Sequence, residues 1–400
     1  MKVLLVGSGG REHALAWALA RSPRLSELHA APGNPGIAAI AQCHPVRADD
    51  PASLVPLAGE LRVDLVVVGP EAPLVAGLAD ELRRRGIAVF GPGAAAARIE
   101  GSKAFAREVM DAAGVPIARR LAAARPPCVV KADGLAAGKG VWVCRTRGEL
   151  DAGLRAAEAL GQRFHVEELL EGPEVSLFAL CDGRGALPLP AAQDYKRIGD
   201  GDTGPNTGGM GSVSPAAPLD GAAADELVAD LVLPVLGELA ERGAAFVGCL
   251  FAGVMLTSDG PRVLEFNCRF GDPETQSLLP RLDGDLLEAL AACAAGDVGG
   301  VALDASPQAA VTVVAAAPAY PEAGDVGSEI AGVAAAEAAG ALVFHAGTAL
   351  HDGRLVTNGG RILNVTALGD TVADARAAAY EAVACIDFAG MRFRTDIANA

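Results

Sequence analysis

The segment Val263–Glu274 carries the residues whose types and spacing most clearly indicate chemistry. Residues two apart on a strand share a face, so Glu265, Asn267 and Arg269 are expected to point the same way. The residues between them are expected to face the core: Leu264, Phe266 and Cys268. A carboxylate beside an amide oxygen suits Mg²⁺ bridging nucleotide phosphates, and an adjacent arginine can stabilise a transferring phosphoryl group. The alternative interpretation is an edge strand with a solvated polar face.

A second candidate is the glycine-rich connection within Val129–Val141, which has the spacing G-x3-G-K-G. It is not a Walker A loop, because no Ser or Thr follows Lys139 and the loop leads into a strand instead of a helix. We predict an antiparallel hairpin whose glycine flap lays backbone N–H groups over phosphates. Lys131 on the strand and Lys139 on the flap would then converge on an oligophosphate.

Lysine is unusually scarce in this chain. The 33 basic residues include only five lysines: Lys2, Lys103, Lys131, Lys139 and Lys196. The last four stand in glycine-rich or capped segments, where a compact ammonium group on a flexible stem suits phosphate binding. Chance is the alternative explanation.

The acidic segment Val166–Ser176 joins a run of carboxylates to a turn and a strand. Extended backbone at such a turn can read the edge of an adenine base, and the carboxylate of Glu174 can accept both hydroxyls of a ribose. Acidic solvated turns are common, and a merely solvated turn is the alternative.

Gly7–Glu12 follows the first expected strand and opens a helix, which is the setting of a dinucleotide fingerprint. Two features argue against a dinucleotide. Glu12 replaces the third glycine, and the second strand ends at Pro32–Gly36 without an acid for the ribose hydroxyl. Free amides at the helix N-terminus would instead suit a single phosphate or phosphoribosyl group. A tight structural turn is the alternative.

Gln193–Ser212 holds six glycines in 20 residues and has no apolar periodicity. A loop of that length inside a compact domain is usually functional or disordered. Lys196 and Arg197 supply local cations that the acidic chain otherwise lacks.

Three regions are expected, of mixed α/β and α+β class. Residues 1–101 alternate short buried strands with helices, which indicates a doubly wound parallel sheet. Its expected strands are Val3–Val6, Leu28–Ala31, Leu65–Val68 and Ala88–Phe90. Its expected helices are Glu12–Arg21, Ala52–Leu61 and Leu74–Arg85.

Residues 102–308 begin with a helix, Lys103–Ala113, capped by Ser102, and continue as antiparallel hairpins. The expected hairpins pair Val129–Lys131 with Val141–Cys144 and Phe246–Leu256 with Val263–Asn267. Residues 309–400 follow as a small α+β region whose last helix starts at Val372 behind a capping box of Thr371 and Asp374. Its expected strands are Val311–Ala315, Leu342–His345 and Arg361–Val365.

Composition excludes several functional classes. The 400 residues carry a net charge of −16, which leaves no excess of cations for nucleic acid. No run of 18 apolar residues occurs, so no membrane span is expected. The N-terminus lacks a secretory cleavage region and the eight cysteines contain no C-x-x-C pair, so we expect a cytoplasmic protein with reduced cysteines.

Taken together, these segments resemble the ATP-grasp carboxylate–amine ligases, and among them the phosphoribosylamine–glycine ligase family. The segments that carry the resemblance are VLLVGSGGREHALA, APGNPG, VVGPEAPL, GSKAFA, VVKADGLAAGKGV, EELLEGPEVS, QDYKRIGDGDTGPNTGGMG and EFNCRFGDPETQ. They occur in the family's order over nearly the whole chain. The resemblance implies an ATP-grasp fold with an N-terminal parallel-sheet domain, a lid at about 117–188 and a small C-terminal domain.

The resemblance also implies an activity in de novo purine synthesis. ATP would phosphorylate the glycine carboxylate, and the amine of 5-phosphoribosylamine would attack the glycyl phosphate, with Mg²⁺ or Mn²⁺ present. It leaves open a transient contact with the upstream amidotransferase.

Residue roles carry over by position. The implied ATP-binding residues are Lys103, Lys131, Gly138, Lys139, Glu167, Leu170 and Glu174. The implied metal ligands are Glu265 and Asn267, and Arg269 is the implied catalytic residue. The implied substrate-binding residues are Gly9, Gly10, Asn34, Lys196 and Arg197 for the phosphoribosyl part and Asp272, Pro273 and Glu274 for glycine.

The chain departs from the family at three places. Pro116–Pro127 is shorter than usual, APAYP stands where the family has a motif like GGYP, and Met255 offers no second acidic metal ligand. Two other interpretations stay open: an ATP-grasp ligase for a different amine, and a nucleotide-binding protein without catalysis.

Overall fold

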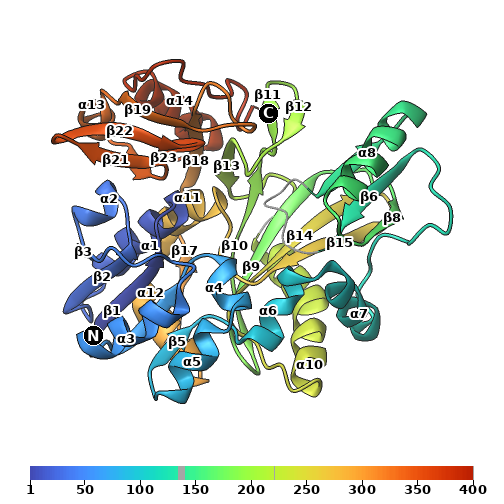
Figure 1. Cartoon of the computed structure of the whole chain (residues 1–400), viewed down its shortest axis with the longest axis horizontal. Coiled ribbons are helices and arrows are strands. Elements are labelled where there is room, and N and C mark those ends of the chain that lie inside the picture. Colours follow the sequence, from blue (N-terminus) through green and yellow to red (C-terminus); the bar gives the residue numbers. More distant parts are fainter. Residues whose placement is uncertain (134–139, 220, 400) are drawn as a thin grey trace.

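The computed structural model describes residues 1–133, 140–219 and 221–399 (Figure 1). Its N-terminal region is a five-stranded parallel sheet in the order β3-β2-β1-β4-β5. The strands are β1 (Lys2–Gly7), β2 (Glu27–Pro32), β3 (Gln42–Cys43), β4 (Leu65–Val68) and β5 (Ala88–Phe90). Strand β4 is buried along its whole length, as parallel strands covered on both faces are. The predicted doubly wound parallel sheet is confirmed.

Six helices accompany this sheet in the described part of the chain. They are α1 (Gly10–Ala20), α2 (Pro35–Ala38), α3 (Pro51–Leu61), α4 (Glu71–Val75), α5 (Leu78–Arg84) and α6 (Ala94–Gly101). The single helix predicted over Leu74–Arg85 is wrong. The chain breaks at Gly77, whose φ of +87° lies in the left-handed region that glycine adopts without strain.

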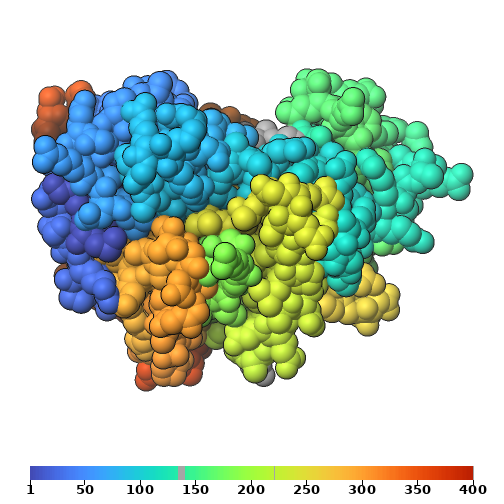
Figure 2. All heavy atoms as spheres, turned by 90° about the horizontal axis from the view of Figure 1, so that it is seen from below, coloured from blue at the N-terminus to red at the C-terminus, as the bar shows by residue number. Residues whose placement is uncertain are grey.

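The second region begins with α7 (Lys103–Ala113), where the Ser102 side chain accepts a hydrogen bond from the amide of Phe105. A small three-stranded sheet lies within the segment predicted as the lid, in the order β7-β6-β8 and covered by α8 (Arg147–Ala159), and we refer to it as the lid. Its strands are β6 (Cys128–Ala132), β7 (Val141–Cys144) and β8 (Phe164–Glu168). Figure 2 shows the lid and the N-terminal region at opposite ends of the molecule, as Figure 1 does.

The body of the molecule is an eight-stranded sheet in the order β15-β14-β9-β10-β13-β18-β23-β20. The first five of these come from the second region: β15 (Gly260–Asn267), β14 (Val247–Thr257), β9 (Glu174–Asp182), β10 (Ala186–Asp194) and β13 (Gly211–Ser214). The other three come from the third region: β18 (Ala309–Ala316), β23 (Arg361–Gly369) and β20 (Leu342–His345). Strand β13 pairs with β18, so one sheet runs across both regions and the boundary at 309 stays a prediction.

The remaining elements cover this sheet or form short hairpins. The helices are α9 (Gly221–Leu227), α10 (Leu233–Glu241), α11 (Glu274–Leu278), α12 (Leu286–Ala295), α13 (Val333–Ala338) and α14 (Val372–Val383). The strands are β11 (Arg197–Gly199), β12 (Thr203–Asn206), β16 (Leu282–Asp283), β17 (Asp304–Ala305), β19 (Asp325–Glu329), β21 (Thr348–His351) and β22 (Arg354–Gly359). The predicted capping box of Thr371 and Asp374 begins α14.

All eight cysteines are unpaired and six are buried; Cys43 and Cys385 are partly exposed. Among the described residues, no helix is long and apolar enough to cross a membrane.

Candidate functional site

The lid and strand β15 meet at Lys131. Its Nζ donates to the carbonyl of Leu264 at 3.1 Å, one residue before Glu265. The same ammonium group lies 2.8 Å from a carboxylate oxygen of Glu167 on β8. The structure therefore brings together the two segments that the sequence indicates for phosphate and for metal.

Glu265 lies in a strongly cationic setting. Burial alone would raise its pKa, but neighbouring ammonium groups hold the pKa below its usual value; these belong to Lys196, Lys131 and Lys103. The side chain is therefore an ionised carboxylate at the pH of the cell.

The expected alternation along β15 fails at Leu264. Glu265 pairs with Gly253 but Val263 pairs with Val254, so a bulge places an extra residue at Leu264. Val263 is buried in place of Leu264, which is half-buried. Phe266 and Cys268 are buried as predicted.

Arg269 is held by carboxylates that the sequence analysis did not connect to it. Its Nη2 donates to Glu100 Oε1 at 2.7 Å and to Asn267 Oδ1 at 3.3 Å. The other oxygen of Glu100 accepts the backbone amide of Cys268 at 2.8 Å, and Glu71 lies 3.5 Å from Arg269 Nε. Burial would lower the pKa of Arg269, but Glu100 and Glu71 raise it above its usual value.

A second arginine donates to the same backbone carbonyl as Arg269. Arg11 of α1 is buried, and its Nη1 donates to the carbonyl of Phe270 at 3.2 Å, as Arg269 Nη1 also does. The sequence analysis missed Arg11, Glu71 and Glu100. Arg11 and Glu71 had a usable signal, because each lies at the start of a helix that follows the carboxyl end of a parallel strand.

The oxygen ligands offered to a metal are few. Among the described residues, no group of three or more His, Cys, Asp or Glu side chains is placed to hold a metal ion. Glu265 and Asn267 remain as a carboxylate and an amide oxygen near the end of one strand. This donor set fits Mg²⁺, which keeps several waters and phosphate oxygens as ligands.

Glu167 is enclosed by cations. It lies 2.8 Å from Arg107 Nη1 and 3.0 Å from His165 Nε2, in addition to its contact with Lys131. Burial would raise the pKa of Glu167, but the His165 hydrogen bond and the Lys131 charge lower it to about 2. Its carboxylate therefore links β8, β6 and α7 in this structure.

Lys196 lies among carboxylates. Its Nζ donates to Glu174, the residue predicted to hold the ribose of ATP. Burial would lower the pKa of Lys196, but Glu174, Asp194 and Glu265 raise it well above its usual value. The predicted phosphoribosyl lysine thus lies between the predicted nucleoside and metal residues.

The glycine turn after β1 is filled by the protein itself. The Gly9 amide donates to Glu12 Oε2 at 2.6 Å, so the expected free amide is wrong at this position. A side-chain carbon at Gly7, Gly9 or Gly69 would collide with the Glu12 carboxylate. These glycines make room for Glu12.

Two other residues predicted to bind the phosphoribosyl group, Gly10 and Asn34, also contact other groups of the protein. A side-chain carbon at Gly10 would collide with Asn364 and Gln276. Asn34 caps α2, where its Oδ1 accepts the amide of Ile37 at 2.9 Å, and its Nδ2 donates to the carbonyl of His345 at 2.8 Å.

The turn Asp272–Glu274 adjoins the glycine turn. Asp272 Oδ2 would lie 3.5 Å from a side-chain carbon at Gly9, and it pairs with Arg361 at 3.2 Å. Burial would raise the pKa of Asp272, but Arg361 and Arg11 hold it below its usual value. Burial raises the pKa of Glu274, whose Oε1 accepts the Ser176 hydroxyl at 3.1 Å.

The remaining predicted residues lie elsewhere in the described chain or outside it. Gly138 and Lys139 fall outside the described residues. Lys103 begins α7 close enough to Glu265 to affect its pKa. Leu170 follows β8, and Pro273 precedes α11. Arg197 Nη1 donates to the carbonyl of Gly204 at 2.6 Å, within its own hairpin.

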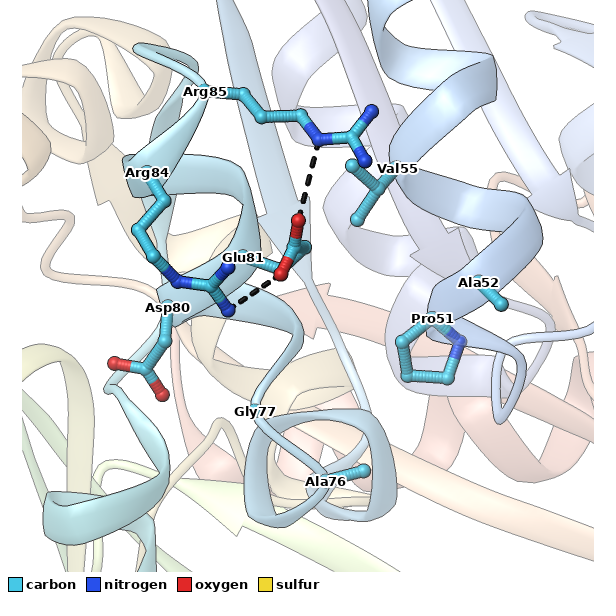
Figure 3. A pocket seen from close by; sticks show the side chains of 9 residues that line it. All are labelled: Pro51, Ala52, Val55, Ala76, Gly77, Asp80, Glu81, Arg84 and Arg85. Atoms are coloured by element: carbon cyan, nitrogen blue, oxygen red, sulfur yellow. Dashed lines mark hydrogen bonds and ion pairs between the residues drawn. The ribbon is translucent and has the colours of Figure 1, made fainter.

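Two surface cavities in the described part of the chain each have a volume of about 540 Å³. One, between the lid and the β11–β12 hairpin, is lined by Trp142, Arg197 and Pro205 among others. The other lies between α3 and α5 and contains none of the predicted site residues (Figure 3). There, Arg84 and Arg85 both turn toward Glu81.

Domain profiles of a known family match along the chain. The N domain of phosphoribosylglycinamide synthetase matches residues 1–100, its ATP-grasp (A) domain 101–275 and its C domain 310–400. The biotin carboxylase domain of 2-oxoglutarate carboxylase from Hydrogenobacter thermophilus aligns with a TM-score of 0.70 at 17% identity, over 98% of this chain and 91% of that one. These matches define the protein as an ATP-grasp enzyme.

Relatives are similar over their full lengths. The phosphoribosylamine–glycine ligase of Brucella melitensis is 51% identical over 99% of this chain and 97% of its own, and that of Streptomyces coelicolor is 51% identical over 100% and 99%. The structure of the Thermotoga maritima ligase aligns with a TM-score of 0.84 at 33% identity, over 99% of this chain and 100% of that one. The chain belongs to the phosphoribosylglycinamide synthetase family.

Proposed function

We propose that this chain is an ATP-dependent ligase that joins glycine to 5-phosphoribosylamine and releases glycinamide ribonucleotide, ADP and phosphate. The observation that carries the proposal is the proximity of Lys131, Glu265 and Lys196, where the lid, β15 and the glycine-rich loop come together. Full-length similarity to phosphoribosylamine–glycine ligases supports this choice among ATP-grasp activities.

The nucleotide half of the site would lie between the lid and β15. Lys131 and Lys103, with Gly138 and Lys139 of the flap, would neutralise the phosphates of ATP. Glu174 would accept the ribose hydroxyls, and Leu170 and Glu167 would border the base. Because Glu167 is enclosed by three cationic or imidazole groups, it would act by placing Lys131.

Glu265 and Asn267 would hold Mg²⁺ or Mn²⁺, which when bound supplies charge neutralisation between phosphate oxygens. Arg269 would stabilise the transferring phosphoryl group. Its buried Nε makes no hydrogen bond within the described structure but lies 3.5 Å from Glu71 Oε2, so a phosphoryl oxygen would compete with that carboxylate for this donor. Glu100 and Glu71 hold the guanidinium group in place.

The substrate half would lie where Asp272–Glu274 meets the glycine turn of Gly9 and Gly10. Glycine would bind at the first segment, and its carboxylate oxygen would take the γ-phosphoryl group. The amine nitrogen of phosphoribosylamine would then attack the carbonyl carbon and lose a proton, while the bond to phosphate breaks. Lys196, Arg197 and Asn34 would border the phosphoribosyl part. We also place this activity in the cytoplasm and retain a transient contact with the amidotransferase that supplies the amine.

The test is ATP hydrolysis measured with glycine and phosphoribosylamine, together and separately. We expect ADP release to depend on both substrates and to match the glycinamide ribonucleotide formed. Release with glycine and a different amine would identify another ATP-grasp ligase. Nucleotide binding without release under any pairing would identify a protein without catalysis.

A further inference from the structure

The C-terminal tail carries a buried arginine that reaches into the glycine-rich loop. Arg394 is 2% exposed and forms two hydrogen bonds to Asp396, each of 2.7 Å. Its Nη1 also donates to Asp202 Oδ1 at 2.7 Å and to the carbonyl of Arg197 at 3.2 Å. Asp202 and Arg197 belong to the loop, so one guanidinium group joins segments almost 200 residues apart.

Arg394 contacts the residues on both sides of Lys196. Its guanidinium group lies 5.2 Å from the centre of the Tyr195 ring, and its Nη1 donates to the carbonyl of Arg197 at 3.2 Å. The Lys196 carbonyl is bonded in turn to Thr207, from the amide at 2.7 Å and the hydroxyl at 2.9 Å. Contacts at Tyr195, Lys196 and Arg197 therefore hold the chain at Lys196 and on both sides of it.

The tail also grips the turn between β11 and β12. Asp200 accepts hydrogen bonds from the amide and hydroxyl of Thr395 at 2.8 and 2.5 Å, and Asp396 accepts the Gly201 amide at 2.8 Å. Figure 1 shows the C-terminus beside this hairpin. Asp202 has φ of +52°, a left-handed conformation that Asp and Asn tolerate better than most residues.

The tail is itself fastened to α14. The Tyr380 hydroxyl donates to the carbonyl of Arg394 at 2.7 Å and accepts the amide of Ile397 at 3.0 Å. Arg376 Nε donates to the carbonyl of Ile397 at 3.0 Å. We call the contacts of Arg394, Thr395 and Asp396 with the loop the clamp. Because the tail bonds to α14, the clamp is attached to a helix and not to a free chain end.

The clamp adds to other contacts that order the loop. Strands β11 and β12 pair with each other, and Gly208 bonds to Tyr320 and Arg361. Ile198 and Met210 form a small apolar cluster with Ala316. Fixing the backbone of a loop costs conformational entropy, and glycines lose the most freedom. Charge-assisted hydrogen bonds to a buried guanidinium group are strong enough to offset part of this cost. The bonds to Arg394 lower the pKa of Asp396 to about 2, so the pair is charged at neutral pH.

We propose that Arg394 is a positioning residue, through which the C-terminal tail holds the glycine-rich loop so that Lys196 meets Glu174 in the active site. This inference rests on the proposed function of Lys196. In the described structure the tail contacts the backbone of Arg197 but none of the predicted ligand-binding side chains. The proposal nevertheless makes the tail necessary for binding phosphoribosylamine.

The test uses Asp202→Asn and Arg394→Lys, with Arg392→Ala as the control. Asn keeps the backbone conformation of the exposed Asp202 and removes only its charge, so this variant stays informative if Arg394→Lys does not fold. Arg392 is an exposed tail residue whose guanidinium group donates to the carbonyls of Pro318 and Tyr320 and, in the described structure, to no residue of the loop. We expect each clamp variant to lower kcat/KM for phosphoribosylamine about tenfold, because a displaced cation loses part of its stabilisation of the transition state. We expect Arg392→Ala to leave kcat/KM unchanged.

The decisive comparison combines each clamp variant with Lys196→Ala. If the clamp acts through Lys196, the double variant will be no slower than Lys196→Ala alone. Losses that multiply would overturn the proposal, as would unchanged kinetics in both clamp variants.

Amide hydrogen exchange separates this inference from the proposed function. The Thr207 amide, bonded to the Lys196 carbonyl, should exchange faster in Asp202→Asn than in Arg392→Ala. Faster exchange together with an inert Lys196→Ala variant would remove Lys196 from the reaction but support the clamp. Unchanged exchange would refute the clamp whatever the kinetics are.

Discussion

At the residue scale, the site combines a carboxylate that is kept ionised with cations that are kept oriented. Glu265 is half-buried, yet its pKa is lowered because ammonium groups from the loop, the lid and α7 lie near it. Arg269 is oriented by Glu100, which also holds the Cys268 amide at the end of β15. Each of these two charges therefore interacts with residues from other parts of the fold.

We predict that Glu265→Gln lowers turnover about 100-fold or more, because an amide is a weaker ligand for a divalent cation than a carboxylate is. The substitution is isosteric, so the fold should persist. Turnover, thermal midpoint and circular dichroism should be compared with those of Glu337→Gln, which changes an exposed side chain of α13. Normal turnover in Glu265→Gln at all metal concentrations would remove this residue from the metal site.

Residue types alone were enough to propose Glu265, Asn267 and Arg269 as site residues, since their spacing on a strand is visible in the sequence. They were not enough to find Glu100, which lies 169 residues away from Arg269. Glu12 shows the opposite error. Its place in a glycine-rich turn suggests a ligand site, but its side chain fills the space those glycines leave open.

At the element scale, the sequence predicted the start of a helix correctly where side chains next to that start determine it. The Ser102 cap of α7 and the capping box of α14 depend on side chains within three residues of the helix start. The bulge at Leu264 was not predictable in this way, because it depends on how β15 pairs with β14. The helix break at Gly77 had only a single glycine as its signal.

The lid depends on a similar tertiary contact, made by Glu167. This carboxylate joins β8 to Lys131 of β6 and to Arg107 of α7. Lys131 also donates to the Leu264 carbonyl of β15. Glu167 therefore helps to fix the position of the lid relative to the predicted metal ligands.

We predict that Glu167→Gln destabilises the protein at neutral pH and that the difference shrinks in acid. The pKa of Glu167 is lowered to about 2, so its stabilisation is complete above the pKa of the unfolded chain, near 4.5, and is lost as pH falls toward 2. Between pH 6 and pH 3.5, the difference in free energy of unfolding should fall by on the order of 1 kcal/mol. Urea unfolding of both proteins measures it. A difference that stays constant over this range would contradict an ionised, paired Glu167.

At the scale of the whole molecule, the N-terminal and C-terminal regions meet directly, although almost the whole chain separates them. His13 of α1 accepts a hydrogen bond at Nδ1 from the His345 amide at 2.8 Å, and the two rings lie 5.5 Å apart. Asn34 bonds the His345 carbonyl, and Gly36 leaves room for both rings. This interface backs the glycine turn of the proposed substrate site.

The interface should make stability depend on pH through His345. Burial lowers its pKa to about 4, whereas an unfolded histidine titrates near 6.5. The folded protein binds fewer protons than the unfolded chain between these values, so stability is complete above about pH 6.5 and is lost as pH falls toward 4. From pH 7 to pH 5 the wild-type protein should lose about 2 kcal/mol more unfolding free energy than His345→Gln, which has no titrating group at this position. Denaturation of both proteins at the two pH values provides the measurement, and parallel losses would mean that His345 is protonated in the folded state. Because His345 is 8% exposed and lies between the two regions, protonation should open the interface before the sheets unfold.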